Sequence, residues 1–220
     1  MKILALETST RVGSVALFEG DALLEEAWLD RSRRTARALA PGIRDLLKQH
    51  GWPPADVELV AVTCGPGSFT GLRLGVTTAK TFAYAVDAEV LGVNTLAAIA
   101  ERAPAGDAPL VVALDAGRGE VFTATFGAGE GEETRIVPVN RWLAELPAPA
   151  RVSGPALETL ADRLPSGVTA VPREVWQPSA AATAALAARH YQSGRRETIW
   201  ELSPQYYRPS AAEEKRMAKK

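Results

Sequence analysis

The sequence is poor in the residues that build disulfides and metal sites. It has a single cysteine, Cys64, and two histidines, His50 and His190, among 220 residues. One cysteine cannot form an internal disulfide, which is typical of a protein of the reducing cytoplasm. The histidines lie far apart in the chain and lack the spacing of metal ligands, so the sequence predicts no metal site.

Long apolar runs and a strong excess of one charge are missing as well. No run of about 18 apolar residues occurs, and Met1-Lys2 leads directly into a strand-like run, so we expect neither a membrane span nor a signal peptide. The formal net charge is −1, which gives no overall field toward nucleic acid or membrane. Only residues 31–37 cluster arginines, which indicates a solvated face or a contact with RNA phosphates or with acids of a partner.

Glycine is concentrated in one segment, CGPGSFTGLR at residues 64–73. It follows a buried strand predicted over 57–63 and leads into a helix predicted over 68–86. Glycines here let backbone approach backbone closely and free N–H groups at the start of the helix. The residues of this glycine-rich turn that we single out are Gly65, Gly67, Ser68, Thr70 and Arg73.

The helix over 68–86 carries two stripes. One is an apolar seam that includes Leu72 and Val76, and the other is a row of small residues at every fourth position, Gly71, Gly75, Ala79 and Ala83. A glycine inside a helix costs roughly 1 kcal/mol against alanine, and close packing of another helix would offset that cost. We therefore interpret this face as a docking surface for a second polypeptide.

A second helix, predicted over 33–49, carries apolar residues on one side, among them Leu39, Ile43 and Leu46. The opening pattern of strand, acid, turn and strand at residues 3–18 returns at 110–126. Such self-similarity, about half the chain apart, predicts two related halves. We expect domains at 1–103 and 104–209, followed by a charged tail at 210–220.

Turns of this composition can serve three kinds of chemistry. A Walker loop needs Gly-Lys-Ser/Thr after its second glycine, where this chain has Gly71-Leu-Arg73. A serine-hydrolase elbow needs glycines at the positions of Pro66 and Thr70, and neither histidine is placed to serve Ser68 as a base. The acids that end two matching strands, Glu7 before Thr8 and Asp115 before Gly117, could hold magnesium and a nucleotide, or could cap their own turns.

Four motifs in order carry a family resemblance: ILALETST at 3–10, GPGSFTGLR at 65–73, ALDAGRGEVF at 113–122 and PQYYR at 204–208. Together they resemble the TsaB (YeaZ) family over nearly the whole chain, and the segment around residues 130–176 matches poorly. The resemblance implies an α/β fold of the actin-like ATPase type. It would have two related subdomains with mixed sheets flanked by helices, the second one abbreviated.

The same resemblance implies a role in making threonylcarbamoyladenosine in tRNA. The chain would be a non-catalytic subunit that pairs with a catalytic paralogue, TsaD, is joined by an ATPase, TsaE, and forms a homodimer when alone. Both pairings would use the helices predicted over 33–49 and 68–86, with Leu39, Ile43 and Leu46 of the first helix at the partner interface. It implies no membrane contact and no firm cofactor, and leaves ATP or ADP with magnesium open at the subunit boundary. Glu7 stands where the family has Asp, which weakens the nucleotide site. An ATP-dependent phosphotransferase and, less favoured, a serine peptidase remain as alternatives.

Overall fold

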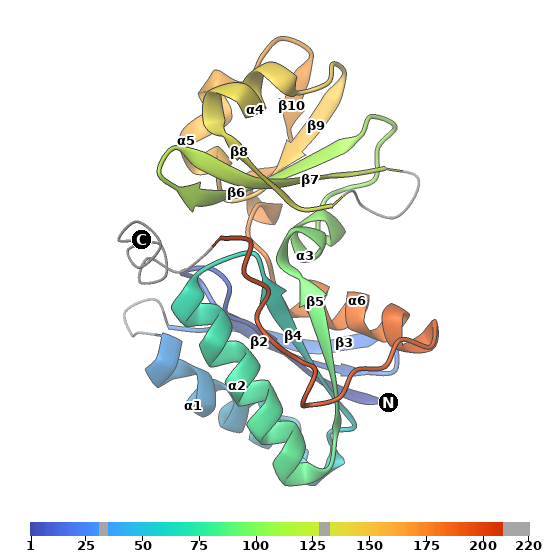
Figure 1. Ribbon diagram of the computed structural model, residues 1–220. Helices are drawn as coiled ribbons and strands as arrows, with labels where there is room; N and C mark the ends of the chain where they lie inside the picture. Colours follow the sequence, from blue (N-terminus) through green and yellow to red (C-terminus); the bar gives the residue numbers. More distant parts are fainter. Residues whose placement is uncertain (31–34, 128–132, 209–220) are drawn as a thin grey trace, which may run out of the picture.

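The chain folds into two five-stranded mixed sheets with helices around them (Figure 1). The computed structural model describes residues 1–30, 35–127 and 133–208, so Arg31, Arg33 and Arg34 and the tail at 210–220 lie outside the described residues. The first sheet has the order β3-β2-β1-β4-β5 and the second β10-β9-β6-β7-β8. The strands are β1 (Lys2–Glu7), β2 (Ser14–Glu19), β3 (Ala22–Trp28), β4 (Leu59–Gly65), β5 (Glu89–Asn94), β6 (Leu110–Gly117), β7 (Glu120–Phe126), β8 (Arg135–Pro138), β9 (Ala150–Ser153) and β10 (Val168–Ala170).

The described residues form six α-helices. They are α1 (Thr35–Gln49), α2 (Phe69–Val86), α3 (Thr95–Glu101), α4 (Val139–Glu145), α5 (Leu157–Leu160) and α6 (Ala180–Gln192), with short 3-10 turns at Pro54–Asp56, Ala161–Arg163 and Arg173–Val175. Side chains cap three of them at the N-terminus. Ser68 accepts from Gly71 N, Asn94 from Leu96 N, and Ser179 from Ala182 N.

The two halves repeat one topology. In each, the first strand pairs antiparallel with the second and parallel with the fourth, as β1 does with β2 and β4, and β6 does with β7 and β9. The repeat predicted from the sequence is therefore confirmed in three dimensions. The second half is abbreviated, because α4 has 7 residues where α1 has 15, and α5 has 4 where α2 has 18.

Alternation along β1 separates the two faces of the first sheet. Leu4 and Leu6 pack with the inner sides of α1 and α2, whereas Ile3 and Ala5 pack with α6. Strand side chains point to opposite faces in turn, so this strand is buried on both sides and reads as a continuous apolar run. The layer order in the first half is α1 and α2, then the sheet, then α6.

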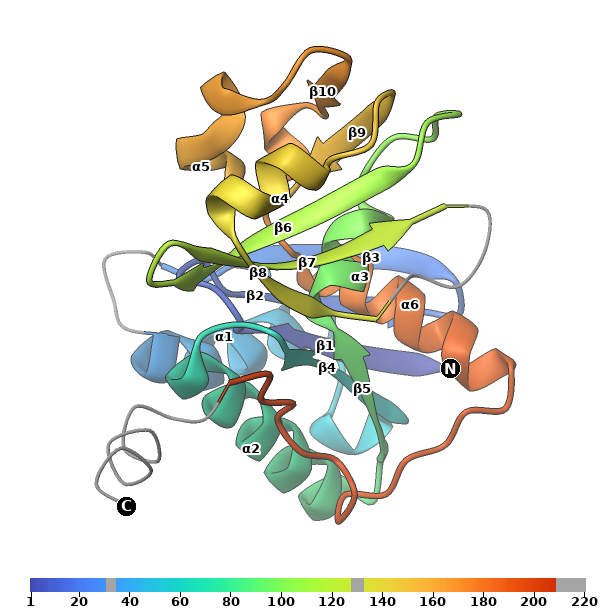
Figure 2. The same ribbon diagram turned by 45° about the horizontal axis from the view of Figure 1, so that its top comes forward.

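One helix from each half of the sequence packs against the sheet of the other half. Leu96 and Ile99 of α3 belong to the core of the second sheet, while α6 contacts β1, β2 and β4 of the first. Figures 1 and 2 show α3 where the two halves meet. The packing therefore differs from the expected domain range 104–209, because α6 and Leu202 pack in the cores of the first half. Sequence order does not reveal this packing, since it depends on contacts between residues far apart in the chain.

Two arginines donate hydrogen bonds to the backbone where the chain passes from one half to the other. Arg102 donates to the carbonyl oxygens of Gln177 at 2.6 Å and Glu174 at 2.9 Å, just before α6. Arg151 donates to three carbonyls of the segment 104–108, among them Ala108 O at 3.2 Å. Within the described residues, no helix is both long and apolar enough to span a bilayer.

Candidate functional site

A cleft of about 1070 Å³ lies between the halves and brings together both predicted hairpin turns. Ser9–Val12 from the first hairpin and Asp115–Arg118 from the second line it, together with Pro66–Phe69 and Gln205–Arg208. Of the glycine-rich turn, Gly67, Ser68 and Arg73 also line this cleft. The structure thus unites motifs that lie far apart in the sequence.

The glycine-rich turn packs against the first hairpin of its own chain. The Ser68 amide donates to Ser9 O at 2.7 Å, and Thr8 Oγ1 donates to Gly71 O at 2.8 Å. A Cβ atom at Gly67 would lie 2.5 Å from Ser9 O, and one at Gly71 would lie 2.0 Å from Thr8 O. These contacts explain the glycines, because only a residue without Cβ fits such an approach.

This packing corrects the interpretation of the small-residue row. Gly75 faces Thr8 Oγ1, which a Cβ would meet at 2.2 Å, and Ala79 and Ala83 are fully buried in the core of the first sheet. The compensating neighbour of the row is therefore the chain's own strand end and sheet.

The other residues expected at the partner interface are also covered by their own chain. Leu39, Ile43, Leu46, Leu72 and Val76 are at most 5% exposed. Leu39, Leu46 and Val76 pack in the core under their own sheet, Leu72 lines the cleft, and Ile43 lies both in that core and at a surface hollow between α1 and α2. A contact of this set with a partner stays a prediction. A change such as Val76→Asp would place a charge in this core and unfold it.

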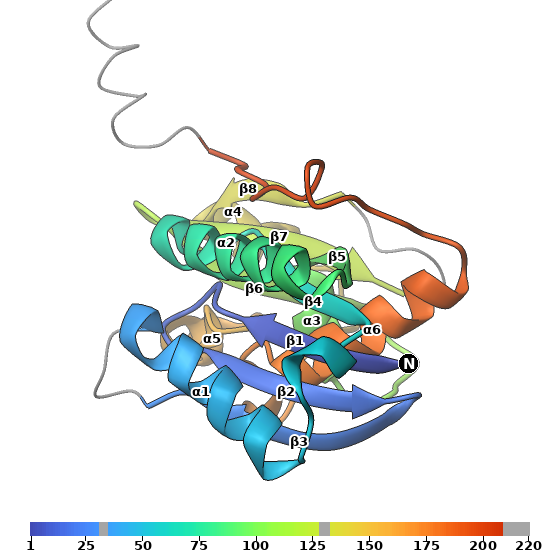
Figure 3. The ribbon, with the colours of Figure 1, turned by 90° about the horizontal axis from the view of Figure 1, so that it is seen from below.

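The C-terminal strap, residues 193–208, was absent from the predicted site residues although PQYYR was noted as a motif. It runs from α6 along β5 and α2 back to the cleft (Figure 3). Gln205 N donates to Cys64 O at 2.7 Å, and Arg73 Nε donates to Tyr206 OH at 2.8 Å. Tyr206 stacks on Phe69 with ring centroids 4.8 Å apart. Neighbouring aromatic and arginine residues at the chain end were the signal that could have found this contact.

The strap also joins the halves. Arg208 donates to Ala116 O at 2.9 Å and forms an ion pair with Glu120, both on the second hairpin. Tyr207 accepts from Asn94 Nδ2 at 3.2 Å and packs edge-on against Phe122. The strap thereby forms part of the wall of the cleft.

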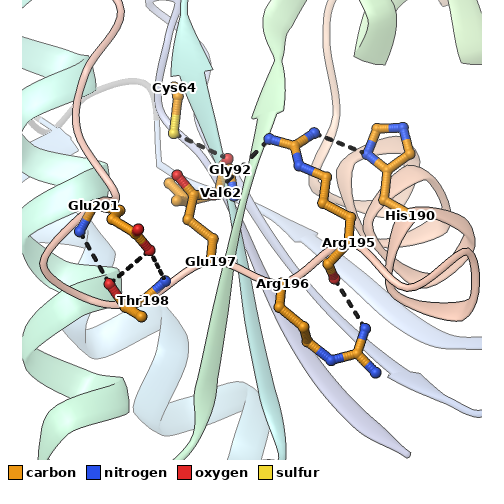
Figure 4. A network of polar contacts seen from close by, with 9 residues as sticks. All are labelled: Val62, Cys64, Gly92, His190, Arg195, Arg196, Glu197, Thr198 and Glu201. Carbon is orange, nitrogen blue, oxygen red and sulfur yellow. Dashed lines mark hydrogen bonds and ion pairs between the residues drawn. The ribbon is translucent and has the colours of Figure 1, made fainter.

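Upstream, the strap covers the edge of the first sheet (Figure 4). Glu197 Oε2 accepts the amide of Gly92 on β5 at 2.8 Å, beside the Cys64 thiol. Burial first, and then the Glu197 carboxylate, raise the pKa of that thiol to about 12. Cys64 therefore stays protonated and is no nucleophile at neutral pH.

The two acids that were considered as magnesium ligands are not brought together. Glu7 is fully buried, and its Oε1 accepts from the amide and hydroxyl of Ser9, both at 2.6 Å. Asp115 lines the cleft and accepts from Gly117 N at 2.8 Å. Both acids cap their own turns. In the described part of the chain, no three His, Cys, Asp or Glu side chains gather as a metal site.

The residues considered for a nucleotide site lie in different surroundings. Ser9–Val12 and Asp115–Arg118 line the cleft, whereas Glu7 and Thr8 are fully buried. Glu7 Oε2 is buried and has no hydrogen-bond partner among the described residues. Desolvation raises the pKa of Glu7, and hydrogen bonds from Ser9 oppose that rise.

Glu7→Gln is expected to remove a pH dependence of stability. Because the folded chain keeps the Glu7 proton to higher pH than the unfolded chain, the unfolding free energy falls as the pH rises through the raised pKa. Thermal melts at pH 4 and pH 8 should therefore give wild type a lower Tm than the variant at pH 8 and a similar Tm at pH 4. Each kcal/mol would shift Tm by about 2–4 °C. If the Tm of the two proteins changed with pH in the same way, Glu7 would not be a buried carboxyl group with a raised pKa.

A serine-hydrolase site is not assembled. Ser68 caps α2, and no histidine is among the described residues that line the cleft. His50 contacts Glu25 at 2.8 Å at the far end of α1, and His190 lies on α6. Ser68 therefore lacks a base.

A second hollow, the α1–α2 groove, lies on the outer side of the first half. It has a volume of about 710 Å³ and a largely apolar lining. Figure 1 shows the two helices side by side on this face. Its residues are Ala40, Ile43, Arg44, Leu47, Lys48, Trp52, Pro54, Thr77, Thr78, Thr81, Phe82 and Ala85.

Comparisons with known proteins extend over most of the chain. It is 30% identical to the tRNA threonylcarbamoyladenosine biosynthesis protein TsaB of Escherichia coli (strain K12), over 96% of each protein. It is 32% identical to the protein of the same name from Bacillus subtilis (strain 168), over 63% of this chain and 60% of that protein's length. The family model described as TsaD, tRNA N6-adenosine threonylcarbamoyltransferase, matches residues 30–196.

Comparison with solved structures gives matches that cover most of the chain as well. YeaZ from Pseudomonas aeruginosa superposes with a TM-score of 0.79 at 28% identity, over 93% of this chain and 99% of that one. The ADPNP-bound activator of 2-hydroxyisocaproyl-CoA dehydratase from Clostridium difficile shares the fold alone, with a TM-score of 0.54 at 10% identity, over 90% of this chain and 99% of that one. Two repeated halves around a cleft thus define a protein of the actin-like ATPase fold. Within that fold, the chain carries the TsaD-type domain and belongs to the TsaB family.

Proposed function

We propose that this chain is a non-catalytic partner subunit of an assembly that makes threonylcarbamoyladenosine in tRNA, at the adenosine beside the anticodon. The observation that carries the proposal is the 30% identity to E. coli TsaB over 96% of both proteins. The transfer step then belongs to a TsaD-type paralogue, and a TsaE-type ATPase joins the assembly.

The geometry of the cleft supports a scaffold role. Its best-placed polar groups have structural partners: Ser68 caps a helix, Arg73 binds Tyr206, and Arg208 binds the second hairpin. Such groups organise the fold and are not free to bind a substrate. The α1–α2 groove is the surface we assign to the paralogue, because it is apolar, outward-facing and formed by the two helices that the family resemblance points to.

Genetic complementation tests the proposal. In a bacterial strain depleted of its own TsaB, expression of this chain together with the TsaD-type paralogue of its source is expected to restore threonylcarbamoyladenosine, measured by mass spectrometry of digested tRNA. The paralogue alone and the chain alone serve as controls and should not restore it. Restoration by the chain without any paralogue would contradict a non-catalytic role, and no restoration by the pair would contradict the proposed function.

A further inference from the structure

The last residues of the strap bind opposite halves in turn. Tyr206 contacts the first half, because it stacks on Phe69 of α2 with ring centroids 4.8 Å apart and accepts a hydrogen bond from Arg73 Nε at 2.8 Å. Tyr207 and Arg208 instead contact strands β6 and β7 of the second half. Neighbouring residues of one segment therefore hold both walls of the cleft.

The contact with the second half combines an aromatic pair with a shielded ion pair. Tyr207 packs edge-on against Phe122 with ring centroids 6.1 Å apart. Arg208 donates to Ala116 O at 2.9 Å and pairs with Glu120, on either side of the turn between β6 and β7. The side chains of Arg208 and Glu120 are only 20% and 30% exposed, so water screens this pair less than a pair on the open surface. Losing the pair would loosen the second half from the strap.

The chain itself crosses between the halves at two places that lie together. It leaves the first half through α3 and returns between β10 and α6. Arg102, at the end of α3, donates to the carbonyl oxygens of Glu174 and Gln177 on the returning segment. Two links joined in this way fix a position but leave an angle free, as in a hinge. Contacts outside the crossings, such as those of the strap, therefore decide the relative orientation of the halves.

We propose that residues 205–208 form a latch that fixes the opening of the cleft, with the two crossings as its hinge. While Tyr207 and Arg208 hold the turn between β6 and β7, the halves keep a single relative orientation. When Arg208 leaves Glu120, the halves rotate about the crossings and the cleft widens. A partner that takes Arg208 away from Glu120 would therefore open the cleft. The latch does not depend on the proposed function.

Distances between spin labels test the latch in the full-length chain. Cysteines that carry nitroxides replace Thr77 on α2 and Ala144 on α4, or Thr77 and Thr169 on β10, so that each pair spans the two halves. These three residues are exposed, whereas the native Cys64 is buried and stays unlabelled. With the latch intact, we expect one narrow distance distribution for each pair, measured by pulsed electron paramagnetic resonance.

Arg208→Glu sets two carboxylates against each other at the latch, and it should at least double the width of one or both distributions. Exchanging the charges, in Arg208→Glu with Glu120→Arg, restores the attraction and should reverse at least half of that change. The matched control is Arg163→Glu, because Arg163 donates to Asn140 Oδ1 at 2.9 Å within the second half. The control should leave both distributions unchanged.

Circular dichroism melts show whether each variant is folded. If Arg208→Glu does not fold, Arg208→Gln replaces it, with the same expected broadening. Unchanged widths in the folded variant, or broad distributions in the chain with its latch intact, would overturn the inference. A charge-exchanged variant as broad as the single variant, or equal broadening by Arg163→Glu, would overturn it as well.

Discussion

Gly71→Ala is expected to destabilise the chain by about 3 kcal/mol, at the upper end of the usual cost of overpacking. The added Cβ would lie 2.0 Å from the backbone oxygen of Thr8, which is fully buried. Neither side can move away freely, because the Ser68 amide holds Ser9 O at 2.7 Å. In an unconstrained helix the same change would stabilise by roughly 1 kcal/mol, so even the sign of the effect reports on this contact.

Urea unfolding followed by circular dichroism measures the effect. Gly127→Ala is the control, because among the described residues no atom beyond its chain neighbours lies within 4 Å of a Cβ at that position, and Gly127 is not among the glycines with a positive φ. It should leave the midpoint almost unchanged. If Gly71→Ala were as stable as wild type, the glycine-rich turn and the first hairpin would not be packed as described.

Thr81→Trp is expected to weaken binding of the TsaD-type paralogue at least 30-fold, about 2 kcal/mol, while the chain stays folded. Thr81 is exposed at the edge of the α1–α2 groove, so the indole would occupy the space that the partner needs. Calorimetry with the paralogue gives the affinity, and a thermal melt gives the stability.

Thr169→Trp provides the matched control. Thr169 is an exposed threonine on β10 of the second half, far in sequence from either groove helix, and its replacement should leave binding unchanged. An unchanged affinity for Thr81→Trp would move the partner interface away from the groove. Equal losses in both variants would indicate a general effect of the added tryptophan.

Local signals in the sequence identified the helices α1 and α2 and the paired strands that open each half. Ser68, Asn94 and Ser179 are of the residue types that cap helices, and each acts as a cap, because a side chain that accepts from the first turn is a local interaction. The repeat of apolar run, acid and turn identified both halves. The helix α4 was missed, since it is a single short segment of 7 residues without a side-chain cap.

The face of a helix that meets a partner could not be predicted in the same way. Spacing identified one apolar side on α2, and either a sheet of the same chain or a helix of another would bury such a side. Val76 and Ala79 proved to cover the sheet, while the groove is edged by threonines and alanine that carry no apolar signal. The strap was missed for a related reason, since Arg208 reaches residues 116 and 120, which lie far away in the sequence.

The position of α6 has a consequence for how the protein is made. Ile3, Ala5, Ala16 and Ala61 on the back of the first sheet are covered by a helix that ends only at Gln192. On the ribosome, that apolar surface stays open to water until Gln192 has emerged, so the first half cannot reach its final stability by itself. The strands β1, β2 and β4 are therefore made well before the helix that covers their back face.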